Sequence, residues 1–175
     1  MLENLDSVDW AKLGHAYGEA TDVPRQLRAL ASGQEKERQK ALWDLHGNIW
    51  HQGTVYEATA VAVPFLLEML KNDHPAPESI LVLLALIANG ASYLEAHGNL
   101  LKMDEEEYRK ELAEELKWVT AAREAVRAGC ELFRDLLESS SSEVRELSIF
   151  LLGILSWRGA TVNIIEKLTG ASDTE

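Results

Sequence analysis

The sequence has a single cysteine, four prolines and no long apolar run. Cys130 alone cannot close an internal disulfide, and one thiol is compatible with a reducing compartment. The longest apolar run, Ile80 to Ala88, is far shorter than the roughly 20 residues that a membrane span needs. The N-terminus carries acidic residues where a signal peptide needs a basic segment followed by an apolar one. The sequence therefore predicts a cytoplasmic protein without a membrane span.

Basic residues are also scarce: 17 Lys and Arg face 29 Asp and Glu, which gives a formal net charge of −12. A field of this sign repels phosphate backbones and anionic membranes, and it speeds the approach of basic proteins at low salt. We therefore expect a basic protein partner and no binding to nucleic acid. The rest of the composition, with 46% hydrophobic residues, is that of one globular domain with a sizeable core.

Alternating strand patterns are missing too, and apolar residues recur at helical spacing along almost the whole chain. A first helix is expected over Ser7–Tyr17, ended by Gly18. The next is expected to begin at Thr21 or Asp22, with Pro24 in its first turn, where the missing N–H costs nothing. The predicted fold class is all-α.

An internal repeat organises these helices. The segment VPRQLRAL at Val23 recurs as VPFLLEML at Val63, 40 positions later. A third copy, CELFRDLLESSSSEVRELSIFLLGIL, fits a further 67 positions on, so about 27 extra residues precede it. The second copy has Glu78 where the other two have Arg38 and Arg145. Two helices per repeat, each pair burying its neighbour, predict a single-domain α-solenoid. The expected parts are repeats at about 22–46, 56–90 and 119–156, an insertion at about 92–118 and a C-terminal capping helix at 160–169.

The segment SSEVRELSIFLLGIL resembles the second helix of a HEAT repeat, which often reads acidic-x-Val-Arg followed by small and leucine-like positions. Pro24 and Pro64 match as well, because the first helices of HEAT repeats often bend near a proline. The stretch GNIWHQGTVYEATAVAVPFLLEML resembles bacterial HEAT-like proteins of the PBS-lyase type. The resemblance covers about Asp22 to Leu155 and implies a short superhelix of helical hairpins. It also implies that Arg38 and Arg145 pair with acidic residues between repeats.

The stretch NIWHQGTVYEAT, residues 48–59, interrupts the helical pattern between the first two repeats. One interpretation is a structural turn, in which Trp50 and Tyr56 pin the crossing to the core. His51 and Gln52 would then bond the loop backbone. A second interpretation is a partner-binding site at one end of a concave surface, formed by these same four side chains. A third is a general base at His51, although such chemistry needs a positioned second group.

The insertion carries a dense acidic cluster at the start of the expected helix MDEEEYRKELAEELKWV. The cluster consists of Asp104, Glu105, Glu106 and Glu107. It is either a solvated helix face or a recognition surface for a basic partner, since insertions into repeat arrays often lie on the binding face. Trp118 and Trp157 are either core residues or aromatic anchors of the same interface.

Metal and cofactor chemistry find no support in the sequence. His46 and His51 are five positions apart, which does not place both on one helical face, and the chain has no Cys pair. HEAT-like di-iron hydroxylases use repeated His-Glu dipeptides, whereas no histidine here is followed by Glu. No Gly-rich strand–loop–helix is present for a nucleotide either. We therefore expect no metal and no cofactor.

The predicted function is that of a non-catalytic protein-interaction module. Its specific form would be an immunity or antitoxin-type inhibitor that docks its concave face and acidic insertion over a basic toxin domain. Electrostatic steering would bring the two together, and the complex would cover the active site of the target. The alternative is a HEAT-like protein that handles a small molecule or cofactor, similar to bilin lyases or base-processing enzymes, and uses the loop around His51.

Overall fold

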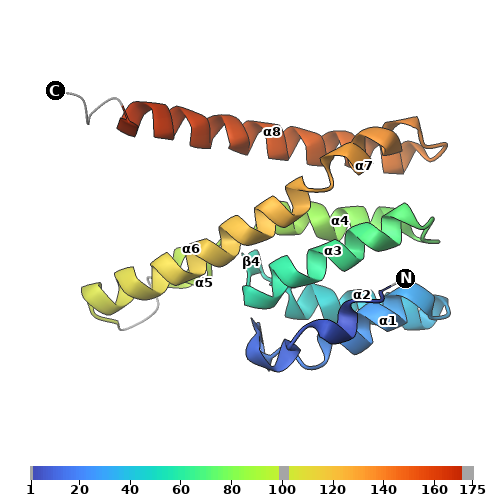
Figure 1. Ribbon diagram of the computed structural model, residues 1–175, viewed down its shortest axis with the longest axis horizontal. Coiled ribbons are helices and arrows are strands. Elements are labelled where there is room, and N and C mark those ends of the chain that lie inside the picture. The colour runs from blue at the N-terminus through green and yellow to red at the C-terminus, as the bar shows by residue number, and fades with distance from the viewer. Residues whose placement is uncertain (1, 99–102, 171–175) are drawn as a thin grey trace.

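The structure, a computed structural model, describes residues 2–98 and 103–170, and for 158–170 it describes the backbone alone. The described chain is predominantly helical, with two small β-hairpins (Figure 1). Its helices are α1 (Val23–Ser32), α2 (Glu35–Asn48), α3 (Glu57–Lys71), α4 (Pro77–Ala88), α5 (Tyr93–His97), α6 (Glu105–Arg127), α7 (Cys130–Asp135) and α8 (Ser142–Gly170). Strands β1 (Gly14–His15) and β2 (Gly18–Glu19) pair antiparallel, as do β3 (Trp50–His51) and β4 (Thr54–Val55). The all-α prediction is confirmed at this coarse level.

Two series of helix contacts run along the molecule. In the first, α1 touches α3, and α3 packs against α6. In the second, α2 touches α4, and α4 packs against α8. The series are joined where α1 packs on α2 and α3 on α4, and Figure 1 shows the α1–α2 pair and α8 at opposite sides of the molecule.

The core is one cluster of buried apolar side chains that all the long helices share. Its centre includes α4, which buries the apolar run Ile80–Ala88 on most of its sides because α3, α6 and α8 surround it. Across the two described segments, 2–98 and 103–170, no helix combines the length and the hydropathy that crossing a membrane requires.

Arg38 and Arg145, which the repeat aligns, make equivalent hydrogen bonds to backbone carbonyls, rather than the predicted pairs with acidic side chains. Arg38 donates to the Gly33 carbonyl at 2.5 Å, and Arg145 donates to the carbonyls of Ser139 and Ser140 at 2.6 and 3.1 Å. Each guanidinium thus closes the turn that precedes its own helix, α2 or α8, rather than pairing with an acidic side chain of a neighbouring repeat. A turn carbonyl without a helical partner needs such a donor, which explains the shared position.

Other repeat positions also correspond. Ala41, Leu81 and Ser148, which the repeat aligns, are all buried in α2, α4 and α8. In the second copy, the Glu78 carboxylate accepts a hydrogen bond from the Ser141 hydroxyl at 3.0 Å. The departure from arginine at this position therefore links the start of α4 to the start of α8.

The N-terminal segment is not the helix predicted over Ser7–Tyr17. It forms short 3-10 turns followed by the β1–β2 hairpin, whose Gly18 has a φ of +121°. Trp10 packs into the core, whereas Tyr17 is 69% exposed at the hairpin loop. The expectation of no strands is wrong here and at residues 50–55, because two-residue strands are too short to show an alternating pattern.

The insertion and the third repeat share one helix. Helix α6 runs without a break across the boundary expected between 118 and 119. Helix α5 packs against α6, and both touch β4, so the insertion lies beside the second hairpin. The backbone of the expected capping helix, 160–169, continues α8 rather than forming a separate helix, and its side chains lie outside the described residues.

Candidate functional site

The stretch that interrupts the helical pattern folds into the β3–β4 hairpin. Its loop residues, Gln52 and Gly53, have φ values of 50° and 94°, which correspond to the type I′ turn that suits paired, twisted strands. The Ala91 N–H donates to the Gly53 carbonyl at 2.9 Å, and the Val55 N–H donates to the Ala91 carbonyl at 3.1 Å. The turn between α4 and α5 therefore holds the hairpin, and with it His51, in place.

Tyr56 belongs to the start of α3. Its hydroxyl donates to Thr54 Oγ1 at 2.7 Å, and Thr54 donates in turn to the His51 carbonyl at 2.7 Å. Its N–H donates to Thr59 Oγ1 at 2.8 Å, and Thr59 donates to the Ile49 carbonyl at 2.6 Å. Burial raises the pKa of Tyr56. These bonds tie the hairpin to α3, as the structural interpretation of the stretch predicts for this side chain.

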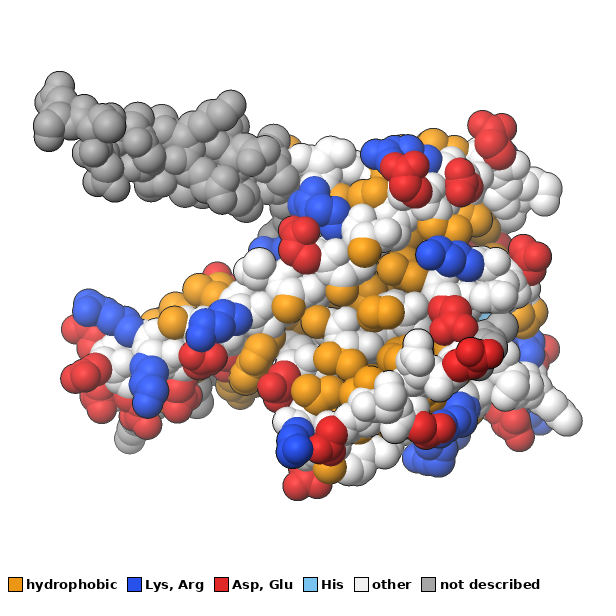
Figure 2. Space-filling view, viewed as in Figure 1, with side chains coloured by type: hydrophobic (Ala, Val, Ile, Leu, Met, Phe, Trp, Pro, Cys, Tyr) orange, Lys and Arg blue, Asp and Glu red, His pale blue; other side chains and the backbone are white. Residues whose placement is uncertain are grey.

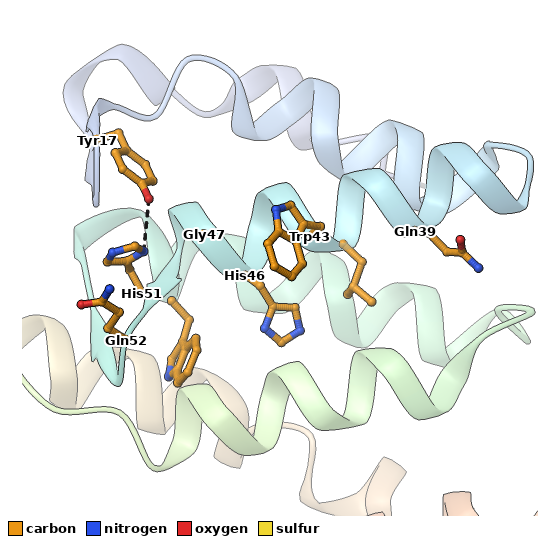
Figure 3. Close-up of a pocket in the computed structure, with 9 residues that line it drawn as sticks. Tyr17, Gln39, Trp43, His46, Gly47, His51 and Gln52 are labelled. Atoms are coloured by element: carbon orange, nitrogen blue, oxygen red, sulfur yellow. Dashed lines mark hydrogen bonds between the residues drawn. The ribbon is translucent and has the colours of Figure 1, made fainter.

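A groove of about 530 Å³ lies between the hairpins and α2 (Figure 3). We call it the aromatic groove, and its lining residues are Tyr17, Gln39, Leu42, Trp43, His46, Gly47, Trp50, His51 and Gln52. Helix α2 supplies one side, the β1–β2 loop supplies Tyr17, and the second hairpin supplies the rest. The structure thus brings together three of the four side chains predicted around the loop, Trp50, His51 and Gln52, whereas Tyr56 is not among the lining residues.

The rings of the aromatic groove are arranged in edge-to-face pairs. Tyr17 and His51 have centroids 5.3 Å apart and ring planes at 72°, and the Tyr17 hydroxyl lies 3.3 Å from His51 Nδ1. His46 and Trp50 have centroids 6.1 Å apart and planes at 86°. Trp43 extends from α2 above His46 and is 79% exposed (Figure 3). A large indole surface is therefore open to solvent beside two ordered ring pairs.

The described lining of the aromatic groove contains no Asp, Glu, Lys or Arg. Burial lowers the pKa of His46, because desolvation disfavours the charged imidazolium. The indole Nε1 of Trp50 is buried and, among the described residues, has no hydrogen-bond partner. A buried donor without an acceptor costs about 1–3 kcal/mol of folding free energy.

His51 lacks the surroundings of a general base. Within the described chain, its ring contacts one polar side-chain group, the Tyr17 hydroxyl. The carboxylates nearest in sequence are engaged elsewhere: Asp44 pairs with Lys40 at 2.5 Å, and Glu57 accepts a backbone N–H at 3.2 Å. Among the described residues, no group of three or more His, Cys, Asp or Glu could hold a metal ion. General acid–base work needs a positioned second group, and for the His51 ring the described side chains supply the Tyr17 hydroxyl.

The acidic cluster lies at the start of α6, away from the aromatic groove. Asp104 Oδ1 accepts the backbone N–H groups of Glu106 and Glu107, both at 3.0 Å, and so caps the helix. Glu105 pairs with Arg109 one turn further on. All four acidic side chains are exposed, and Figure 2 shows charged side chains gathered at this end of the molecule.

The two remaining predicted anchors lie on different helices. Trp118 is half-buried on α6. Trp157 is 72% exposed on α8, where Phe150 is exposed on the same face two turns earlier. Neither tryptophan lines the aromatic groove, so the structure does not join them to Trp50 and His51 in one site.

Comparison of the chain with models of protein families, with curated proteins and with solved structures finds no match.

Sequence reasoning missed Tyr17, Trp43 and His46. For Trp43 a signal was present, because it lies off the apolar stripe that Ala41 and Leu45 form on a helix whose other faces are charged or polar. For Tyr17 there was none, since its role depends on a contact with a residue 34 positions away.

Proposed function

We propose that this chain is a non-catalytic protein-binding module and that its aromatic groove receives a side chain of the partner. The observation that carries this proposal is Trp43, whose indole is 79% exposed beside four further rings. Tryptophan and tyrosine are enriched among the residues that dominate binding energy, and clustered exposed apolar surface marks interaction sites. An uncovered tryptophan beside ordered rings fits such a role.

The architecture that we propose is the HEAT-like α-solenoid. The two series of helix contacts support it, and so do Arg38 and Arg145, which close equivalent turns before α2 and α8. Stacked helical pairs of this kind form extended surfaces that suit protein partners.

The partner that we propose is basic, because the chain carries a net charge of −12. The exposed Glu105, Glu106 and Glu107 would steer it toward the molecule. The specific form of this function is an immunity or antitoxin-type inhibitor in a bacterial cytoplasm, which blocks a basic toxin domain by covering its active site.

A second candidate function is favoured by the size of the groove. At about 530 Å³ it falls within the range of roughly 300–1,000 Å³ that small-molecule sites occupy. A HEAT-like protein that handles a bilin or a nucleobase would use the rings around His51 to stack on a planar ligand. A thermal-shift screen with tetrapyrroles and nucleobases tests this candidate, and stabilisation by either would favour it over protein binding.

The main proposal is tested by capture of the partner from the native cell at low and moderate salt. The baits are the tagged wild type, Trp43→Ala and Trp157→Ala. We expect one stoichiometric basic protein on the wild type and on Trp157→Ala, weaker capture at moderate salt, and loss of capture on Trp43→Ala. Equal capture by all three baits would show that the partner binds outside the aromatic groove. Absence of capture at both salt concentrations would favour the small-molecule function instead.

A further inference from the structure

The aromatic groove continues beyond its rings. Gln39 and Leu42 also line a second hollow of about 340 Å³, which extends between the start of α2 and the residues that open α4. The second hollow is more polar, because Glu35 and Arg38 line it. The two hollows share Gln39 and Leu42, so they lie next to each other along α2, one toward the β3–β4 turn and the other toward the turn before α4. Two adjoining hollows along one helix fit an extended chain segment rather than a compact ligand.

The aromatic groove has room between its rings. Gly47 lies on α2 between Trp43 and the second hairpin, and a Cβ placed on it would meet only the edge of the Tyr17 ring, at 3.9 Å. The missing side chain at this position therefore leaves open the space that Tyr17, Trp43 and His46 surround (Figure 3).

The charges of the chain indicate which kind of partner side chain would bind between the rings. Phosphate is disfavoured, because no Lys or Arg is among the described lining residues of the aromatic groove and the chain is strongly acidic. A cation is favoured, because indole and phenol faces attract positive charge and the overall field is negative. A guanidinium suits these rings better than an ammonium, since it is planar, stacks on aromatic faces and is more weakly hydrated. Gln39 and Gln52 line the two ends of the groove, and Figure 3 shows their amides directed away from Trp43 and His46, so the rings are the main recognition surface.

We infer that the aromatic groove binds an arginine side chain from an extended segment of the basic partner, with the guanidinium stacked on Trp43. This inference rests on the proposed function and adds to it the residue that the groove recognises. The segment continues along α2 into the second hollow, while the ring pairs Tyr17–His51 and His46–Trp50 surround the arginine.

The test uses four capped pentapeptides, in which glycines flank a central arginine, citrulline, lysine or phenylalanine. Citrulline keeps the shape of arginine and removes its charge. Binding is followed by NMR chemical shifts of the labelled protein. We expect saturable binding of the arginine peptide at millimolar concentration, about fivefold to tenfold tighter than that of the citrulline peptide. The indole signals of Trp43 and Trp50 should shift.

Two variants and one control locate the site. Trp43→Ala removes the stacking surface, and Gly47→Met fills the space between the rings at a position where added atoms meet little. Both should lose the arginine peptide while they keep the wild-type melting temperature to within a few degrees. Trp157→Ala, which removes a similarly exposed tryptophan on α8, should bind as the wild type does.

Equal binding of the citrulline or phenylalanine peptide would overturn the choice of arginine, as would binding that survives in Trp43→Ala. Absence of saturation with the arginine peptide would overturn it too. These results are separate from a failure of the proposed function. If a partner is captured through Trp43 but the arginine peptide does not displace it, the protein-binding function stands and the inference of an arginine is wrong. Absence of any captured partner would count against the function itself.

Discussion

The aromatic groove and the acidic cluster at the start of α6 are both exposed, but one is assembled from three chain segments and the other from four successive residues. The groove depends on tertiary contacts such as that between Tyr17 and His51, so any loosening of the fold removes it. The cluster acts through its field, which reaches about 10 Å at ordinary ionic strength and needs no defined geometry. Changes in the groove should therefore alter affinity in large steps, whereas changes in the cluster should alter association rates in small ones.

The largest effect is expected for Trp43→Ala. Loss of an exposed tryptophan at the centre of a binding site typically costs about 2–4 kcal/mol of binding free energy, or about 30-fold to 1,000-fold in affinity. The free energy of unfolding should change by less than about 0.5 kcal/mol, because the side chain is largely solvated. Calorimetric titration of the purified partner and denaturant unfolding measure the two quantities. Comparable losses in both would show that Trp43 supports the fold rather than the interface.

Substitution of Asp22, which does not line the aromatic groove, should also disrupt the groove. Its carboxylate accepts hydrogen bonds from His15 Nε2 at 2.9 Å, Gln26 Nε2 at 2.7 Å and Asn48 Nδ2 at 2.9 Å, and so joins the first hairpin to α1 and to the end of α2. Asp22→Ala leaves the buried amides of Gln26 and Asn48 without this acceptor, at an expected cost of about 2–3 kcal/mol in unfolding free energy.

Partner affinity should fall in the Asp22→Ala variant, while the helicity of α6 stays unchanged. Urea unfolding, followed by circular dichroism, checks the stability. A variant as stable as the wild type would mean that solvent replaces these bonds without loss.

A smaller effect is expected when Glu105, Glu106 and Glu107 are all changed to Gln. The association rate should fall about threefold to tenfold at low salt and match the wild type at high salt, because steering is screened. Asp104→Asn is the matched control, since asparagine keeps the helix cap and removes one charge. Stopped-flow experiments at several salt concentrations measure the association rate constants. An unchanged rate constant in the triple variant would reject steering by this cluster.

The last prediction concerns pH and His46. Because burial lowers its pKa below the ordinary value of 6.5, the unfolded state takes up a proton before the folded state does. The contribution of this group to stability is fully present above pH 6.5 and decreases as the pH falls through the lower, folded-state pKa. His46→Gln should remove that part of the pH dependence. Unfolding free energies at several pH values between 5 and 7.5, taken for both proteins, provide the measurement, and parallel curves would contradict the assignment.

Much of the helical framework could be predicted from the sequence. The start of α1 after Asp22, with Pro24 in its first turn, follows from local preferences, and the break at residues 48–59 follows from the loss of helical period. The repeat also located positions with shared roles, including Arg38 and Arg145, although it did not reveal that they bind turn carbonyls. These features depend on neighbours within one or two turns, which a single sequence displays.

The candidate site could be predicted only in part. Trp50, His51 and Gln52 stood out because they interrupt a regular pattern, but the wall opposite them is Tyr17, which was assigned to a helix. The first hairpin has strands of two residues and is held by contacts with α2 and α3, such as the hydrogen bonds from the Ala16 N–H to the Asn48 carbonyl at 3.0 Å and from the Gly14 N–H to the Glu57 carboxylate at 3.2 Å. Long-range contacts of this kind leave no periodic trace in the sequence, so the groove emerged only from the folded chain.

The first hairpin has a kinetic consequence for the groove. It provides one wall and is attached to the helices by a few hydrogen bonds, from Gly14 to Glu57, from His15 to Asp22 and from Ala16 to Asn48. Segments attached by few bonds open locally at lower free energy than global unfolding requires. A bound partner that touches Tyr17 would hold this wall shut, so the Ala16 amide should exchange with deuterium more slowly in the complex. The lifetime of the complex would then depend on how often the hairpin opens as well as on the strength of the contacts that it covers.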